Sequence, residues 1–500
     1  MNGNDSGRPN IVLIMSDQHN AHVMRNAGDA IVQTPSLDAL ASEGVRFDAC
    51  YCPYPLCIPS RMGFMTGQYP SEVDIWDNGN VLDSGVRTFA HALSEAGYET
   101  ALCGRMHFVG PDQLHGFEKR LYGDCDHFLS SEIRGSGSHR TNGQTRYAVE
   151  VSGHGRMGYE EFDKRVTEKA CEFVARREDG RPYCMVVGYA LPHNPLICER
   201  ELFEYYMESL PAPEQPSAGE LAKLNPAIRA WRERRGVNDI SPEHARRARA
   251  AYYGLVSTLD RNIGRVVEAV KGSRGGEATV IIYCGDHGDM AGEHGMWWKS
   301  NYYEGSVRVP LIVSCPSRFV GGRSVASVVN LIDVGPTLIE LARGEPLPKV
   351  SGRSLAGFLE GKPPGDWSNE TMAQYVGDHG DRPSCMIRSG PWKLMFYSEF
   401  DSYLLFNLEE DPGELNDRAG DSSCAEVAKA LLAKVRTRFS AERMIEGNAR
   451  QRSRQEVLSG EGHAETESRM YDRPSKEANV FDFSQVPGWE AIRERARADR

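Results

Sequence analysis

Residues 57–61, with the sequence Cys-Ile-Pro-Ser-Arg, combine side chains that suit nucleophilic chemistry. Pro59 and Ser60 favour the start of a helix, which places Cys57 just before the first turn. Free backbone N–H groups at that position attract an anion and lower the pKa of a thiol. Arg61 lies one turn further on and can reach back to an oxyanion. We therefore interpret Cys57 as a candidate nucleophile, although a lone cysteine is more commonly a small buried apolar residue.

Acidic side chains follow two of the most strand-like runs of the chain. Asp17 and Gln18 come directly after one run. Asp286 and His287 come shortly after another. Carboxylates favour Ca²⁺ or Mg²⁺, whereas an imidazole among them favours Mn²⁺ or Zn²⁺. Each pair alone would be interpreted as turn or helix-cap residues. Together they predict a site for one divalent cation. The amide oxygen of Gln18 could be a further ligand of that cation.

The elements that must bring these groups together alternate between strand and helix. The predicted strands are residues 10–16, 99–103, 183–189, 279–283 and 309–314, and the predicted helices are residues 34–44, 88–96, 161–177 and 245–271. The strands are short continuous apolar runs, the pattern of parallel strands that are buried on both faces. This alternation predicts an α/β fold with a large, mostly parallel sheet sandwiched by helices. Ligands of such sheets bind beyond the carboxyl ends of the strands, where both acidic pairs lie.

The pattern changes toward the C-terminus. The sequence there shows short strand-like pieces with turns, among them residues 385–394 and 403–408, followed by a charged, partly helical stretch. We predict an α/β domain over residues 1–367 and a smaller C-terminal α+β subdomain with a charged tail over residues 368–500. Residues 133–158 are rich in glycine, serine and histidine without periodicity, so we expect a surface loop near a site, or a lid.

The composition limits the classes of partner. The chain has 500 residues, and its 58 lysines and arginines against 70 aspartates and glutamates give a net charge of −12 at pH 7. This balance argues against general affinity for nucleic acid or an anionic membrane, and no apolar stretch reaches the ~18–20 residues that span a bilayer. Residues 1–10 lack the pattern of a signal peptide, and without one the twelve cysteines are expected to be thiols. We expect a cytoplasmic protein.

Several motifs of the sequence resemble those of type I sulfatases in the alkaline phosphatase superfamily. Cys-x-Pro-Ser-Arg followed by Thr-Gly, at residues 57–67, is similar to the first signature of that family, and Gly-Tyr-x-Thr leading to Gly-Arg-x-His, at residues 97–107, is similar to the second. Further matches are Pro-His-Asn-Pro at 192–195, Asp-His-Gly-Asp at 286–289, Gly-Met-Trp-Trp-Lys at 295–299, Arg-Val-Pro-Leu at 308–311 and Asp-Pro-Gly-Glu at 411–414. All stand in family order, and residues 106–118 look most like choline sulfatases.

The resemblance implies an alkaline-phosphatase-like fold and the hydrolysis of a small-molecule sulfate ester to an alcohol or phenol and inorganic sulfate. In sulfatases the signature cysteine is oxidised to formylglycine (3-oxoalanine) by a formylglycine-generating enzyme, and its hydrated form is a gem-diol. Carried onto this sequence, one hydroxyl at Cys57 binds the metal and attacks sulfur, and the second hydroxyl then loses its proton and expels sulfate. A serine or an unmodified cysteine would lack that second hydroxyl.

The resemblance also implies which residues hold the metal. The implied ligands are Asp17, Gln18, Asp286, His287 and the modified Cys57. His287 replaces the asparagine of many lysosomal-type sulfatases, which makes Mn²⁺ an alternative to Ca²⁺. Gln18 replaces an aspartate, as it does in choline sulfatases and phosphonate monoester hydrolases.

Catalytic roles are implied for the remaining matched residues. Arg61 would orient the gem-diol, and His107 would take the proton that triggers the release of sulfate. His193 and Lys299 would contact the sulfate oxygens and protonate the leaving group. Arg105 stands where the family has a lysine, and arginine keeps the positive charge but cannot donate a proton at ordinary pH.

Several alternatives stay open at the level of sequence. Groups that would cage the trimethylammonium of choline are not identifiable, so choline, an aryl group or a sugar could be the alcohol. A phosphonate monoester or phosphodiester hydrolase would share the nucleophile and the metal site, although Arg105 and His107 favour a sulfatase. A non-catalytic anion-binding protein would use the same fold with an unmodified cysteine. We expect a homo-oligomer, with the C-terminal tail either solvated or clasping another subunit.

Overall fold

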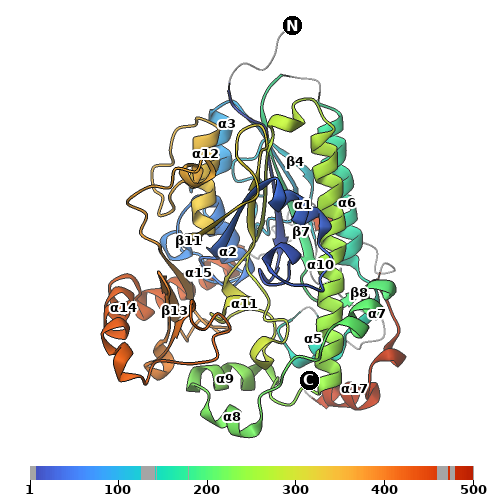
Figure 1. The fold of residues 1–500 in the computed structure, drawn as a ribbon, viewed down its shortest axis with the longest axis vertical. Helices are drawn as coiled ribbons and strands as arrows, with labels where there is room; N and C mark the ends of the chain where they lie inside the picture. Colours follow the sequence, from blue (N-terminus) through green and yellow to red (C-terminus); the bar gives the residue numbers. More distant parts are fainter. Residues whose placement is uncertain are drawn as a thin grey trace.

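The computed structural model describes residues 7–125, 141, 143–177, 180–458, 471–472 and 479–498. Its centre is an eight-stranded sheet with the strand order β11-β2-β10-β9-β1-β7-β3-β4 (Figure 1). The strands are β1 (Ile11–Asp17), β2 (Gly44–Tyr51), β3 (Glu99–Gly104), β4 (Lys119–Tyr122), β7 (Tyr183–Pro192), β9 (Val280–Gly285), β10 (Leu311–Ser314) and β11 (Arg323–Asn330). Strand β10 runs antiparallel to its neighbours β2 and β9, and the other pairings are parallel. The predicted α/β class with a mostly parallel sheet is confirmed.

Helices cover both faces of this sheet (Figure 1). One face carries α1 (Pro35–Ser42), α6 (Gly158–Ala175) and α10 (Pro242–Lys271), and the other carries α2 (Cys57–Thr66), α3 (Phe89–Glu95) and α12 (Val334–Leu341). Strands β1, β7 and β9 are buried along their whole length. Because neither face of these strands meets water, nearly every position is apolar, and this is why they read as continuous apolar runs.

All of the strands and helices predicted for the large sheet form, with small shifts at their ends. The sequence reasoning missed β2, β4 and β11, although they lie inside or at the two edges of the same sheet. Strand β2 mixes buried and partly exposed positions, and Arg46 and Asp48 on it form an ion pair with Nε and Oδ1 2.8 Å apart. A strand with charged residues on one face carries no continuous apolar run to reveal it.

The expectation of an irregular loop over residues 133–158 is only partly testable. Residues 126–140 and 142 lie outside the described residues. Part of the described remainder is regular, because it forms α5 (Arg146–Glu150) and β6 (Gly153–Arg156). Both elements are too short to show periodicity in the sequence, and β6 gains its hydrogen-bond partners from β8 (Ile197–Cys198), a distant part of the chain.

A second, smaller sheet forms the C-terminal part of the fold, on the left of Figure 1. It is antiparallel, with the order β12 (Glu370–Tyr375), β13 (Ser384–Ser389), β14 (Trp392–Tyr397) and β15 (Ser402–Asn407). The predicted strand-like piece over residues 385–394 is in fact a hairpin, because Gly390, with a φ of 53°, turns the chain between β13 and β14. Helix α14 (Ala425–Arg438) packs on this sheet, which confirms a smaller α+β subdomain, whereas the domain boundary at residue 367 stays a prediction.

The end of the chain returns to the first part of the molecule. After α15 (Ala441–Leu458), strand β16 (Tyr471–Asp472) pairs with β5 (Asp124–Cys125), and β17 (Val480–Phe481) pairs with β6. The remaining helices are α7 (Arg200–Ser209), α8 (Ala218–Lys223), α9 (Pro226–Arg235), α11 (Glu304–Val307), α13 (Ala356–Leu359) and α17 (Trp489–Ala498). Over the described ranges, none of the helices combines the length and the apolar character that crossing a bilayer requires.

Candidate active site

Four adjacent parallel strands, β9, β1, β7 and β3, end at one edge of the large sheet. Asp17 ends β1, Asp286 follows β9, His193 follows β7 and Arg105 follows β3. The carboxyl ends of parallel strands meet at the same edge, which is where open α/β sheets bind their ligands. The topology therefore brings together residues that lie far apart in the sequence.

Cys57 reaches this edge from the start of helix α2. The sequence reasoning placed it just before the first turn, whereas in the structure it is the first residue of the helix, with Leu56 as the extended N-cap residue. Pro59 fits inside the first turn because the first N–H groups of a helix have no partner within the helix. The N–H of Ile58 donates to Oδ1 of Asn78 at 3.0 Å.

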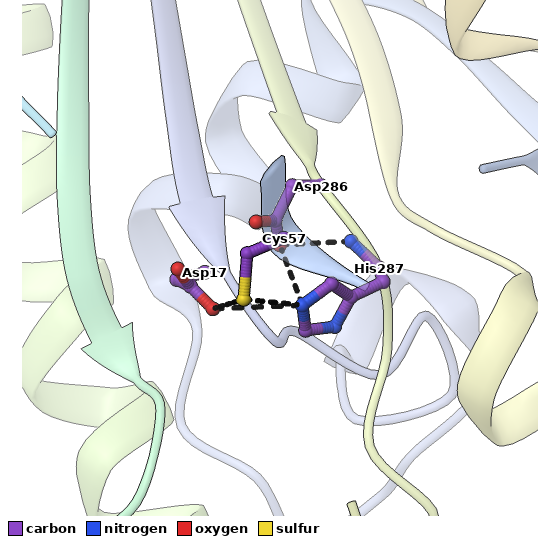
Figure 2. Close-up of side chains that lie close together, drawn as sticks. All are labelled: Asp17, Cys57, Asp286 and His287. Carbon is purple, nitrogen blue, oxygen red and sulfur yellow. Dashed lines mark hydrogen bonds and ion pairs between the residues drawn. The ribbon is translucent and has the colours of Figure 1, made fainter. Parts of the chain in front are cut away.

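A buried cluster of four side chains forms where these elements meet (Figure 2). One ligand atom from each of Asp17, Cys57, Asp286 and His287 lies within 4.8 Å of the others. Sγ of Cys57 lies 3.2 Å from Nε2 of His287 and 3.7 Å from Oδ1 of Asp17. Figure 2 shows the sulfur of Cys57 between the carboxylate of Asp17 and the imidazole of His287. The structure thus joins four of the five predicted metal ligands in one cluster.

These four side chains fit a divalent cation by their donor chemistry. Nδ1 of His287 lies 3.1 Å from the carbonyl oxygen of Gly288. Since a carbonyl can only accept, Nδ1 carries the proton and Nε2 turns its lone pair toward the cluster. Burial lowers the pKa of His287 to about 4, against the opposing charge of Asp286, so the ring is neutral near pH 7, as a metal ligand must be.

Nearby cations hold the carboxylates of the cluster in place. Burial by itself would raise the pKa of Asp17, but the positive charges around it, first among them Arg105, hold its pKa well below the usual range. Arg61 donates from Nε to Oδ2 of Asp286 at 2.8 Å and from Nη2 to Oδ2 of Asp17 at 3.2 Å. Arg61 is completely buried, and its hydrogen bonds fix both carboxylates at once.

Arg105 occupies the place that the family gives to lysine, and its guanidinium has several partners. Nε donates to Oδ2 of Asp17 at 2.6 Å, and Nη2 lies 2.9 Å from Nδ1 of His107. Nη1 lies 3.6 Å from Oδ1 of Asp124, a buried carboxylate that the sequence reasoning missed. Asp124 also accepts hydrogen bonds from the backbone N–H groups of Met106 and His107. Because β5 is only two residues long and begins at Asp124, no apolar run marked this aspartate as part of a strand.

Lys299 and Gln18 meet beside the cysteine. Nζ of Lys299 lies 3.2 Å from Sγ of Cys57 and donates to Oε1 of Gln18 at 2.7 Å. Nε2 of Gln18 donates to Oδ2 of Asp289 at 2.6 Å and to Oδ1 of Asn194 at 3.2 Å. The amide oxygen of Gln18 thus accepts from Lys299 here, and its role as a metal ligand stays a prediction. Asp289 and Asn194 lie in motifs that were matched in the sequence, but the sequence reasoning gave them no role at this site.

Two histidines of the predicted site are more exposed than the buried cluster. Cys57, Asp17 and Asp286 are at most 1% exposed, whereas His193 is 7% exposed and His107 is partly exposed. The imidazole of His193 lies at the end of β7, with Nδ1 2.7 Å from the carbonyl oxygen of Asn194.

The sequence matches known families over most of its length. A family model described as "Sulfatase" matches residues 9–345, and one described as "N-sulphoglucosamine sulphohydrolase, C-terminal" matches residues 292–440. A choline-sulfatase of Rhizobium meliloti (strain 1021) is 34% identical over 438 residues, which cover 83% of each chain. An arylsulfatase of Clostridium perfringens (strain 13 / Type A) is 29% identical over 441 residues, which cover 82% of this chain and 90% of the relative.

Solved structures share the fold. The protein BT4656, in complex with its substrate D-glucosamine-2-N,6-O-disulfate, superposes with a TM-score of 0.67 at 22% identity, covering 91% of this chain and 100% of that chain. The phosphonate monoester hydrolase of Agrobacterium radiobacter superposes with a TM-score of 0.71 at 22% identity, covering 89% of this chain and 96% of that chain. At this level of identity the likeness establishes the fold.

The match to the family model and the geometry of the site lead to the same assignment. The family model spans residues 9–345, which include every residue of the buried cluster. The signature cysteine, Cys57, is one of the four residues of that cluster. This chain therefore belongs to the sulfatase family of sulfuric ester hydrolases, in the alkaline phosphatase superfamily.

Proposed function

We propose that this protein hydrolyses a small-molecule sulfate ester to an alcohol or phenol and inorganic sulfate, with the oxidised side chain of Cys57 as its nucleophile. The observation that carries the proposal is the convergence of Cys57 with Asp17, Asp286 and His287, whose ligand atoms lie within 4.8 Å of one another. A formylglycine at position 57, made by a formylglycine-generating enzyme, would offer oxygen in place of sulfur to a Ca²⁺ or Mn²⁺ ion at this point. The bound ion would supply Lewis-acid activation of the nucleophilic hydroxyl.

The two arginines keep the site in its working geometry. Arg61 and Arg105 both donate to Oδ2 of Asp17, so this carboxylate is fixed in orientation while Oδ1 faces Cys57. Charge-assisted hydrogen bonds of this kind are among the strongest available to a side chain. The arginines thus preorganise the ligands without contributing ligand atoms of their own.

Lys299 and His193 are the candidates for contact with the sulfate group and with its leaving alcohol. The ammonium of Lys299, 3.2 Å from Sγ of Cys57, would stabilise negative charge on the sulfate oxygens as the bond to the alcohol breaks. His193, at the more exposed side of the cluster, would protonate the departing oxygen. Substrates with poor leaving groups depend most on this proton.

For the leaving alcohol of the substrate we propose several candidate classes. The choline-sulfatase and the arylsulfatase that this chain is similar to suggest choline-O-sulfate and aryl sulfates as first candidates. A phosphonate monoester hydrolase of the same fold suggests phenyl phosphonates as the competing class. A comparison of kcat/KM for an aryl sulfate, choline-O-sulfate and a phenyl phosphonate separates these classes, and a much larger value for the phosphonate would reverse our assignment.

Modification of Cys57 is the first test of the proposed nucleophile. Protein made with a formylglycine-generating enzyme is expected to show a peptide around Cys57 that is lighter by about 18 Da than the thiol form. Cys57→Ala is expected to lower kcat on 4-nitrophenyl sulfate by at least about 10³-fold, because it removes the group that forms the covalent bond. Cys50→Ala, another buried cysteine, is the matched control. Wild-type rates in Cys57→Ala would rule out the proposed nucleophile.

We also propose that the protein works in a reducing compartment, the cytoplasm. All twelve cysteines are unpaired in the structure, as expected where thiols stay reduced. Fractionation of the source cells with an antibody to the protein would test this location, and recovery outside the cytoplasm would contradict it.

A further inference from the structure

Two of the three imidazoles at the site carry their proton on Nδ1. Nδ1 of His193 lies 2.7 Å from the carbonyl oxygen of Asn194, and Nδ1 of His287 lies 3.1 Å from that of Gly288. A carbonyl oxygen only accepts hydrogen bonds, so each Nδ1 is the donor. In the neutral form of both rings the lone pair is therefore on Nε2.

His107 has the opposite arrangement. Its Nδ1 lies 2.9 Å from Nη2 of Arg105. A guanidinium only donates and does not lose its proton in proteins, so Nδ1 of His107 must be the acceptor. The neutral ring therefore carries its proton on Nε2.

The position of Arg105 is fixed by partners on several sides. Its Nε donates to Oδ2 of Asp17 at 2.6 Å, and Nη1 lies 3.6 Å from Oδ1 of Asp124. Asp124 in turn accepts from the backbone N–H of His107 at 2.6 Å, which holds that residue at a φ of 64°. Arg105 is fully buried. Both residues of the contact between Arg105 and His107 are thus held in place by other hydrogen-bond partners.

This contact disfavours a proton on Nδ1 of His107. Nε2 already carries one, and a proton on Nδ1 would place N–H against N–H and one positive charge beside another. A lysine, as in the family pattern, is a single charged point on a flexible chain and would not hold Asp17 and His107 together in this way. The planar fork of Arg105 reaches both residues at once.

We propose that His107 acts as a permanent hydrogen-bond donor through Nε2, that Arg105 is the positioning residue that fixes this tautomer, and that His193 is the imidazole that exchanges protons with the substrate. The identity of the donor's partner, an oxygen of the sulfate group or of the side chain at position 57, rests on the proposed function. The tautomers do not rest on it. This assignment differs from the role implied by resemblance, in which His107 takes up a proton.

The tautomers can be measured without any turnover. Neutron diffraction, or ¹⁵N NMR of protein with labelled histidine and His107 assigned by its loss in His107→Gln, reports which nitrogen carries the proton. We expect a protonated Nε2 and a bare Nδ1 in His107, and a protonated Nδ1 in His193. Arg105→Lys is expected to move the ¹⁵N signals of His107 toward a tautomer mixture. A protonated Nδ1 in wild-type His107 would overturn the proposal, whether or not the protein hydrolyses sulfate esters.

Activity measurements provide an independent test. If His107 only donates, the amide of His107→Gln replaces the donor and keeps kcat within about tenfold of wild type, whereas His107→Ala loses about 10²–10³-fold, the usual effect of removing one donor to a developing oxyanion. Equal losses in the two variants, at unchanged Tm, would contradict the donor role.

His193→Gln makes the complementary measurement. An amide can donate a hydrogen bond but cannot transfer a proton, so we expect this variant to lose much more kcat on an alkyl sulfate than on 4-nitrophenyl sulfate, whose leaving group needs no proton. The same comparison on His107→Gln should show no dependence on the leaving group. A leaving-group dependence confined to His107→Gln would reverse the assignment of the two histidines.

Discussion

At the residue scale, the two carboxylate oxygens of Asp17 have different partners, and so do those of Asp286. Oδ2 of Asp17 and Oδ2 of Asp286 accept hydrogen bonds from Arg61. Oδ1 of each lies 3.7 Å from Nε2 of His287, inside the cluster. A carboxylate has lone pairs for both directions, so the arginine orients the aspartates without covering the oxygens that face the cluster. A cation can therefore enter without breaking the ion pairs.

Metal binding at this cluster can be measured on the unmodified protein. We expect Mn²⁺ or Ca²⁺ to raise the Tm of the wild type, since a ligand that binds only the folded state stabilises it. Asp286→Asn removes one charged ligand and is expected to weaken binding by at least about tenfold, by analogy with the 10–100-fold effects of residues that merely support a ligand. Asp48→Asn, in an exposed pair with Arg46, is the control. Equal metal-induced shifts in all three proteins would place the ion elsewhere.

At the element scale, a single glycine lets β3 deliver Arg105 to the site. A Cβ on Gly188 of β7 would lie 1.7 Å from the carbonyl oxygen of Arg105. No side chain fits in that distance, so the end of β3 can approach β7 only because residue 188 has none. The guanidinium of Arg105 then enters the cluster from the neighbouring strand.

A second element contact joins two helices on one face of the sheet. Helix α1 has no side-chain N-cap of its own, and its first N–H groups turn instead to Asp260 of α10. The N–H groups of Ser36 and Leu37 donate to the two oxygens of Asp260 at 3.0 and 2.9 Å. Burial, the largest influence, raises the pKa of Asp260 from 3.8 to about 6 despite these hydrogen bonds.

This contact predicts a pH dependence of stability. Because the folded-state pKa of Asp260 lies above its unfolded value, the contribution of this group to the free energy of unfolding is complete below about pH 3.8 and is lost as the pH rises through 6. The loss amounts to about 3 kcal/mol at most. Asp260→Asn lacks this loss, so the Tm of the wild type relative to the variant is expected to fall between pH 4 and 7 and to level off above. A difference that stays constant with pH would refute this account.

At the scale of the whole molecule, a buried charged triad connects the large sheet with the C-terminal sheet. Nζ of Lys393, on β14, lies 2.8 Å from Oε1 of Glu304 and 2.8 Å from Oε1 of Glu414. Glu304 begins α11, five residues after Lys299, and Glu414 ends the Asp-Pro-Gly-Glu motif. This motif thus has a structural use, because it fixes the segment that follows Lys299.

Removal of the central cation should destabilise the fold strongly. Lys393→Met leaves two buried carboxyl groups facing each other and is expected to cost about 3–5 kcal/mol, seen as a lower Tm. Adding Glu304→Gln and Glu414→Gln to the same variant should restore most of the Tm, since no buried charge then lacks a partner. Lys429→Met, at an exposed position, should leave Tm unchanged. A Lys393→Met variant with the wild-type Tm would contradict the importance of the triad.

The sequence by itself determined the framework and the matched site residues. Strands β1 and β9 were predictable because burial on both faces requires an apolar residue at almost every position. Asp17 and Asp286 were predictable as a pair because they follow those runs. Strand β2 was missed because it carries charges, and Asp124 was missed because its strand is two residues long and exists only through pairing with residues far along the chain.

Only the tertiary structure decided which hydrogen-bond partners these residues have. The sequence shows an arginine in place of a lysine, but not that its fork spans Asp17 and His107. It shows the three histidines of the matched motifs, but not which ring nitrogen of each carries the proton. The physical reason is that hydrogen-bond direction depends on which donor or acceptor lies within about 3 Å, and those neighbours come from different strands whose adjacency no local pattern encodes.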